Sequence, residues 1–213
     1  MKNIKEAVLN YEIANGISHG LGLLFGIVAI PILISLAVVK GSPPAIVGAA
    51  VYGFSFLMVY AFSTLYHSAY NPKVKRVMRI MDHISIYFLI AGSYTPFVLA
   101  FIFNTKGIII LSVVWGLALM GIFFKAFFIN RFKLFSTAVY LLMGWMAVFM
   151  GESLLMGMPT SVLTLIAVGG VLYSVGVVFY LWKRLSYNHM IWHLFVLAAS
   201  VCHYVAVLLT IVQ

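Results

Sequence analysis

Seven long apolar runs, separated by short polar segments, dominate the pattern of this chain. Each run exceeds the roughly 20 residues that a helix needs to cross the hydrocarbon of a bilayer. The runs are continuous, which favours helices, because the strands of a membrane barrel alternate apolar and polar positions. We therefore expect a single domain over residues 1–213, an all-α integral membrane protein folded as a seven-transmembrane helix bundle. The predicted spans are residues 17–39, 45–67, 82–103, 107–129, 134–155, 159–182 and 189–212.

Composition supports a membrane protein and argues against a soluble one. Hydrophobic residues make up 64% of the 213 positions and charged residues only 8%, and a soluble domain of this size could not bury so much apolar surface. The formal net charge of +9 would suggest nucleic acid as a partner of a soluble protein. Because the basic residues flank apolar spans, we instead expect topology and contact with anionic lipid to explain the charge, and no nucleic-acid partner.

The basic residues alternate between gaps and so predict an orientation. Eleven of the 13 Lys and Arg side chains fall before span 1 or around every second gap, and only two fall in the opposite gaps. Lys and Arg collect on the cytoplasmic side of membranes. We therefore expect residues 1–16 to be a cytoplasmic N-terminal segment and the C-terminus to be external. The two exceptions are Lys40 and Lys106.

Three histidines at span ends predict a metal site. His67 ends the second span, and His189 and His193 begin the seventh, so the topology places all three at a similar depth. Ionisable residues inside membrane spans are candidate functional residues by default. His189 and His193 are four apart and share one helix face, and three protein ligands with one open position is the arrangement of catalytic zinc.

Two further polar residues lie at the same depth. Asp82 begins the third span and could hold and deprotonate a water at the metal, or be a fourth ligand. Ser63 lies one turn before His67 and could hydrogen-bond the water or a substrate carbonyl. The alternatives are an interfacial His67, a chance pair at His189 and His193, and an Asp82 that caps its helix.

The remaining histidines have weaker signals. His83 is about 100° around the helix from Asp82, so we expect a structural role. His203 lies about 15 Å deeper than His193, and we expect a core histidine with satisfied hydrogen bonds. For His19, near Glu12, a supporting or gating role and membership of a local polar cluster both remain open.

The order of several short motifs resembles the haemolysin III family, the bacterial branch of the progestin and adiponectin receptor (PAQR) superfamily. The resemblance covers essentially the whole chain. The motifs are EIANGISHG at 12–20, FSTLYH at 62–67, DHISIY at 82–87, AGSYTP at 91–96 and HMIWH at 189–193.

This resemblance implies a multi-pass protein of the bacterial cell membrane with a cytoplasmic N-terminus. It implies Zn²⁺ held by His67, His189 and His193, with Asp82 on the metal's water and Ser63 close by. It also implies kinship with membrane hydrolases that act on lipid amides, the alkaline ceramidases.

Three functions are compatible with these observations. The first is a zinc-dependent intramembrane hydrolase of lipid amides or esters, involved in membrane lipid homeostasis, with membrane lipids as substrate or ligand. The second is a sensor or regulator of membrane state without enzymatic activity, in which zinc is structural. The third, a cytolysin or haemolysin-like pore, ranks lowest because the spans carry no regular polar stripe for a water-filled lumen. The sequence does not fix the oligomeric state.

Overall fold

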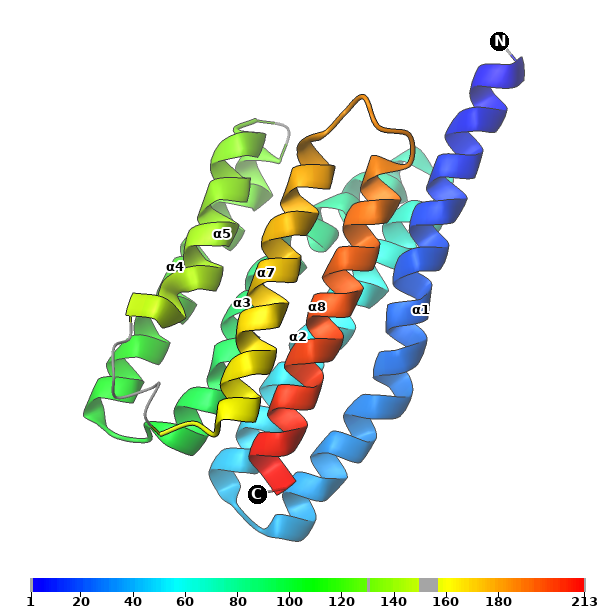
Figure 1. Cartoon of the computed structure of the whole chain (residues 1–213). Coiled ribbons are helices and arrows are strands. Elements are labelled where there is room, and N and C mark those ends of the chain that lie inside the picture. Colours follow the sequence, from blue (N-terminus) through cyan, green and yellow to red (C-terminus); the bar gives the residue numbers. More distant parts are fainter. Residues whose placement is uncertain (1, 130, 150–156, 213) are drawn as a thin grey trace.

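The computed structural model describes residues 2–129, 131–149 and 157–212, and in these residues it contains seven helices and no strand. The helices form one bundle, in which successive helices run in opposite directions (Figure 1). This confirms the predicted all-α bundle. The helices are α1 (Lys2–Lys40), α2 (Pro43–Ser68), α3 (Pro72–Phe101), α4 (Thr105–Phe128), α5 (Lys133–Phe149), α7 (Thr160–Leu181) and α8 (Asn188–Val212).

Six of these helices are long and apolar enough to cross a membrane, and the chain is a multi-pass membrane protein. The exception is α5, which has 17 residues where the structure describes it. The end of its predicted span, residues 150–155, lies outside the described residues. Its start at Lys133 agrees with the predicted start at 134.

Two helices begin well before the predicted membrane spans. The polar segment before residue 17 is already helical, since α1 begins at Lys2. α3 begins at Pro72, ten residues before the predicted start at 82. Proline suits the first helical position, and the Asn71 side chain accepts hydrogen bonds from the amides of Lys73 and Val74. The basic segment after Pro72 is therefore helix and not loop.

Close helix packing builds the core between α1, α2, α3 and α8. The side chains of Tyr52 and Tyr60 are fully buried, and the Tyr52 hydroxyl donates to the Ser200 carbonyl oxygen at 3.1 Å. α2 and α3 approach so closely at Gly48 that an added Cβ would lie 2.7 Å from the Pro96 Cα. Small residues of this kind allow membrane helices to approach.

The alternating helix directions bring the polar ends of several spans together. The end of α2 and the starts of α3 and α8 lie at the same end of the bundle as the start of α1, uppermost in Figure 1. The end of α8 lies at the opposite end of the bundle. The side of the membrane that each end faces remains a prediction from the distribution of Lys and Arg.

Candidate metal centre

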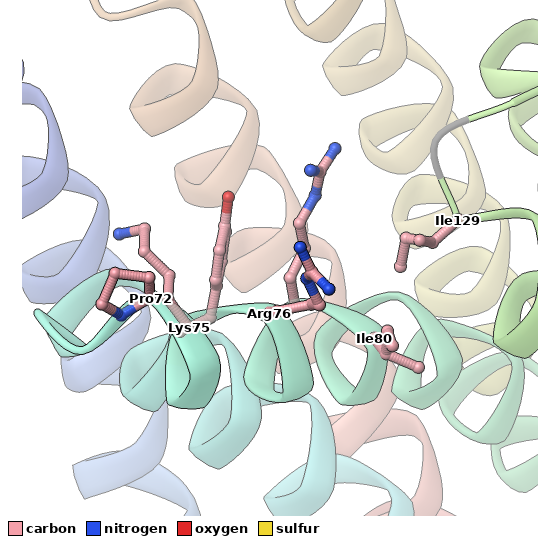
Figure 2. A pocket seen from close by; sticks show the side chains of 7 residues that line it. Pro72, Lys75, Arg76, Ile80 and Ile129 are labelled. Carbon is pink, nitrogen blue, oxygen red and sulfur yellow. The ribbon is translucent and has the colours of Figure 1, made fainter.

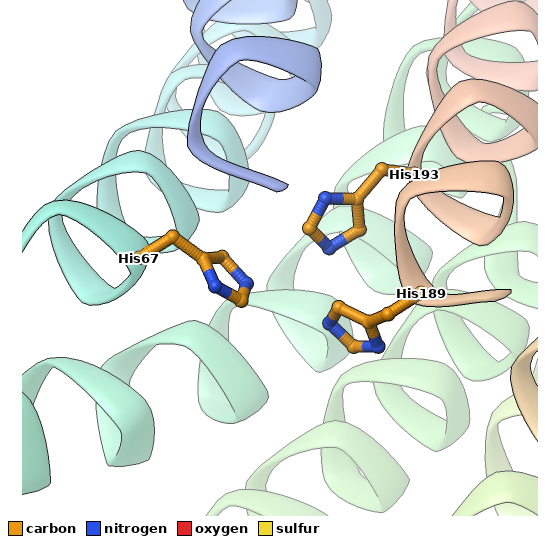
Figure 3. Close-up of side chains that lie close together, drawn as sticks. All are labelled: His67, His189 and His193. Atoms are coloured by element: carbon orange, nitrogen blue, oxygen red, sulfur yellow. The ribbon is translucent and has the colours of Figure 1, made fainter. Parts of the chain in front are cut away.

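The three histidines predicted from sequence come together between α2 and α8. One ring nitrogen of each of His67, His189 and His193 lies within 4.8 Å of those of the other two. Figure 3 shows the rings turned toward one another, one from α2 and two from α8. His67 and His193 are buried and His189 is half-buried. Within the described ranges, no cysteine, aspartate or glutamate joins this group.

The hydrogen bonds of His67 leave one nitrogen ready for a metal. Its Nδ1 lies 2.7 Å from Oε2 of Glu12, and its Nε2 is buried with no hydrogen-bond partner in the described residues. A carboxylate only accepts hydrogen bonds, so Nδ1 donates its proton and Nε2 keeps a lone pair. A metal-binding histidine is typically oriented in this way by a carboxylate on its other nitrogen.

His193 is oriented from the same helix, α1. Its Nδ1 lies 3.2 Å from the Asn15 carbonyl oxygen and 3.0 Å from Oγ of Ser18. The Ser18 hydroxyl itself donates to that carbonyl at 2.8 Å, so both acceptors face the imidazole N–H. Nε2 of His193 is then the nitrogen available to a ligand.

These residues fit a zinc ion. Tetrahedral zinc with Zn–N distances of about 2.0–2.1 Å separates its nitrogen ligands by about 3.4 Å, which the 4.8 Å limit of this group accommodates. In His67 and His193, the hydrogen bond at Nδ1 leaves the lone pair of Nε2 directed toward the centre of the group. The buried and unpaired Nε2 of His67 is costly without a partner, which a metal would supply.

Asp82 and Ser63 adjoin the histidines without belonging to the group. The Asp82 side chain is 13% exposed and lies within electrostatic range of His67. Ser63 is fully buried and close enough to Asp82 to interact with it, although its hydroxyl does not reach hydrogen-bond geometry within the described part of the chain. Nδ1 of His83 bonds to the Arg79 carbonyl oxygen at 2.8 Å, and its structural role stays a prediction, because His83 also lines the cavity beside Asp82.

His19 belongs to the site, which sequence reasoning had left open. Its ring stacks on His193 with the centroids 3.6 Å apart, and both its nitrogens are buried without hydrogen-bond partners in the described structure. Glu12, Asn15 and His19 are spaced three and four apart, which places them on one face of α1. That spacing is the signal that could have grouped them with the metal centre.

An apolar cavity of about 310 Å³ extends from this site into the bundle. Asp82, His189 and His193 line it at the candidate metal centre, and His203 lines it about three turns beyond His193 along α8. The prediction of a satisfied His203 holds for one of its two nitrogens: Nε2 hydrogen-bonds the Ile166 carbonyl oxygen at 3.4 Å, whereas Nδ1 is buried with no partner among the described residues. Most of the apolar residues that line the cavity come from α3, α5 and α7.

Comparison with known proteins identifies the family. A family model described as Haemolysin-III related matches residues 8–204. This chain belongs to the haemolysin III family. It is 45% identical to Hemolysin-3 of Bacillus cereus over 92% of this chain and 90% of the relative. It is 46% identical to a Hemolysin-3 homolog of Bacillus subtilis (strain 168) over 92% of each chain.

A more distant relative comes from animals. The human monocyte to macrophage differentiation factor is 28% identical over 74% of this chain and 67% of its own length. No solved structure matches the chain significantly. The resemblance drawn from the sequence motifs is therefore confirmed by the family match.

Proposed function

We propose that this haemolysin III family protein binds zinc through His67, His189 and His193 and hydrolyses an amide or ester bond of a membrane lipid. The observation that carries the proposal is the single cavity that joins the histidines and Asp82 to an apolar chamber. Its volume of about 310 Å³ lies within the range of small-molecule sites, roughly 300–1,000 Å³. An apolar chamber inside a membrane bundle suits an acyl chain and not a soluble substrate.

Each polar side chain has a role in such a reaction. When bound, zinc supplies Lewis acidity that acidifies water and polarises a carbonyl group. Asp82 accepts the proton of the attacking water and returns it to the leaving nitrogen or oxygen, as a general base and then a general acid. Ser63 orients the water or the carbonyl oxygen through its hydroxyl, which has no hydrogen-bond partner of ideal geometry among the described residues. The apolar wall excludes bulk water from the acyl chain.

The test is hydrolysis of a defined lipid amide and a defined lipid ester by purified protein. The His193→Ala variant should lose both metal and turnover. The Asp82→Asn variant should keep the metal and lose turnover by about a hundredfold or more. Ser112→Ala, an exposed position on α4, is the matched control and should equal the wild type. Equal turnover by the wild type and Asp82→Asn would refute this mechanism.

A structural role for zinc is the second candidate, and the hydrogen bonds of α1 favour it. Glu12 and Asn15 of α1 hold His67 of α2 and His193 of α8, so a metal on both rings would fasten three helices. The protein would then sense or regulate membrane state without turnover. Chelation should in that case lower the melting temperature in detergent, and no lipid amide or ester should be hydrolysed. An unchanged melting temperature after complete metal removal would exclude this role.

A further inference from the structure

A buried lysine lines the cavity, and the catalytic proposal does not use it. Lys125 lies in the last turn of α4, and only 2% of the residue is exposed. It shares the cavity wall with Asp82 and with Lys133 at the start of α5. A lysine that serves only to orient a span extends its ammonium group toward water. Lys125 is instead enclosed by the bundle.

The protein offers this lysine no counter-ion among the described residues. The chain has only four acidic side chains, at positions 6, 12, 82 and 152. Glu12 bonds His67 and Lys75, and Glu6 is exposed near the start of α1. Asp82, the one acidic residue in the cavity lining, interacts with His67 and Arg79, and residue 152 lies outside the described residues.

The charges around Lys125 are of the same sign. Arg79 and Lys133 both lie close enough to repel its ammonium group. Burying the Lys125 ammonium group beside two other cations, without a partner of opposite charge, is expensive in a low-dielectric interior. An anion placed between Lys125 and Lys133 would relieve the repulsion and recover the desolvation cost.

A positively charged cleft of about 580 Å³ lies beside this end of the cavity. Figure 2 shows Pro72, Lys75, Arg76 and Ile80 along the first turns of α3, with Ile129 facing them from the end of α4. Arg79 also lines the cleft, and none of the acidic residues that the structure describes does. Ile129 lines the cleft and Lys125 lines the cavity, and the two residues are four apart at the end of α4. The cleft and the cavity therefore lie about one helical turn apart along this helix. Basic side chains therefore extend from the surface to the interior.

We propose that the cavity binds an acyl lipid whose head group is anionic, a phosphate or a carboxylate, with that group held by Lys125 and Lys133. The acyl chain occupies the apolar part of the cavity between α3, α5 and α7. Asp82 and the histidines then face the bond next to the head group. The inference deepens the proposed function by naming its substrate class, but the binding step does not depend on turnover.

The test compares the binding of three single-chain amphiphiles to purified, zinc-loaded protein. The probes are palmitoyl glycerol phosphate, palmitate and the neutral monopalmitoylglycerol, with inorganic phosphate as a fourth arm without an acyl chain. At least one of the two anionic lipids should bind about tenfold or more tightly than the neutral one, as expected for hydrogen bonds to a charged partner. The ratio between the phosphate and carboxylate probes identifies the head group.

Substitutions of the two cavity lysines test whether the preference for an anionic lipid arises in the cavity. Lys125→Met should weaken binding of the anionic lipid by about tenfold or more and leave the neutral lipid within about twofold. Lys133→Met, at an exposed position, should act in the same direction. Arg184→Gln, an exposed basic residue outside the cavity, is the matched control and should bind as the wild type.

Three results would overturn the inference. The first is equal affinity for the neutral lipid and both anionic lipids, and the second is an unchanged preference in both lysine variants. The third is inorganic phosphate that binds as tightly as palmitoyl glycerol phosphate, which would contradict a lipid site. A failure to hydrolyse any lipid would leave these affinity ratios intact, so the two proposals fail separately.

Discussion

The Glu12→Gln variant should bind zinc about tenfold more weakly than the wild type while remaining folded. Glu12 contacts no metal in this arrangement. It fixes His67 by accepting the Nδ1 proton at 2.7 Å, which leaves Nε2 as the ligand atom. Glutamine keeps an oxygen acceptor but loses the negative charge that strengthens this bond and raises the basicity of the ring.

The magnitude follows from the surroundings of the bond. A hydrogen bond to a charged group contributes about 1.5–3 kcal/mol, equivalent to roughly ten- to a hundredfold in affinity. Two features favour the lower end of this range of affinity change. The Glu12 side chain is 28% exposed, so solvent screens its charge, and Lys75 lies 3.2 Å from its other oxygen and offsets part of that charge.

Zinc affinity is measured by competition with a fluorescent chelator, alongside the melting temperature of each protein. Glu6→Gln is the matched control, because Glu6 is also acidic and on α1 but is exposed. It should bind zinc as the wild type does. A Glu12→Gln affinity within about twofold of the wild type, with normal folding, would refute the view that Glu12 positions His67 for metal binding.

Three further predictions follow from the packing, the topology and the cavity. Gly48→Ala should destabilise the bundle by about 1–3 kcal/mol, because the new Cβ meets backbone of α3, whereas Gly116→Ala, with no heavy atom within 4 Å of the added Cβ, should leave the melting temperature unchanged. In a cysteine-free background, Lys73→Cys should react with an impermeant thiol reagent only from the cytoplasm and Lys106→Cys only from outside, and the reverse pattern would contradict the predicted orientation. Purified protein at low density in liposomes should release no more ions than empty liposomes, and a clear ion flux would revive the pore hypothesis.

Hydropathy predicted the membrane-spanning helices well, but it did not predict that two of them begin well before their apolar spans. Apolar runs report where a helix lies in lipid, and they do not report how far it continues into water. α3 extends ten residues beyond its apolar run because Asn71 and Pro72 provide a helix start and the basic residues that follow are good helix formers. The same limitation applied to the polar start of α1.

The cluster of three histidines was predictable and its supporting contacts were not. His189 and His193 could be grouped because helical spacing fixes their common face, and His67 because topology fixes its depth. The contacts of Glu12 and His19 with these rings depend on α1 packing against both α2 and α8, which no local pattern encodes. The inward direction of Lys125 likewise depends on the rotation of α4 about its axis. From the sequence alone, Lys125 could be interpreted only as one of the basic residues that predict the orientation in the membrane.

The zinc content of the purified protein tests the central claim most directly. Elemental analysis should find about one zinc per chain in the wild type and none in a variant with His67, His189 and His193 all replaced by alanine. His203→Ala, which removes another buried histidine of the same cavity, should retain the metal. A wild type without stoichiometric zinc, or a triple variant that keeps it, would contradict the assignment of the metal centre.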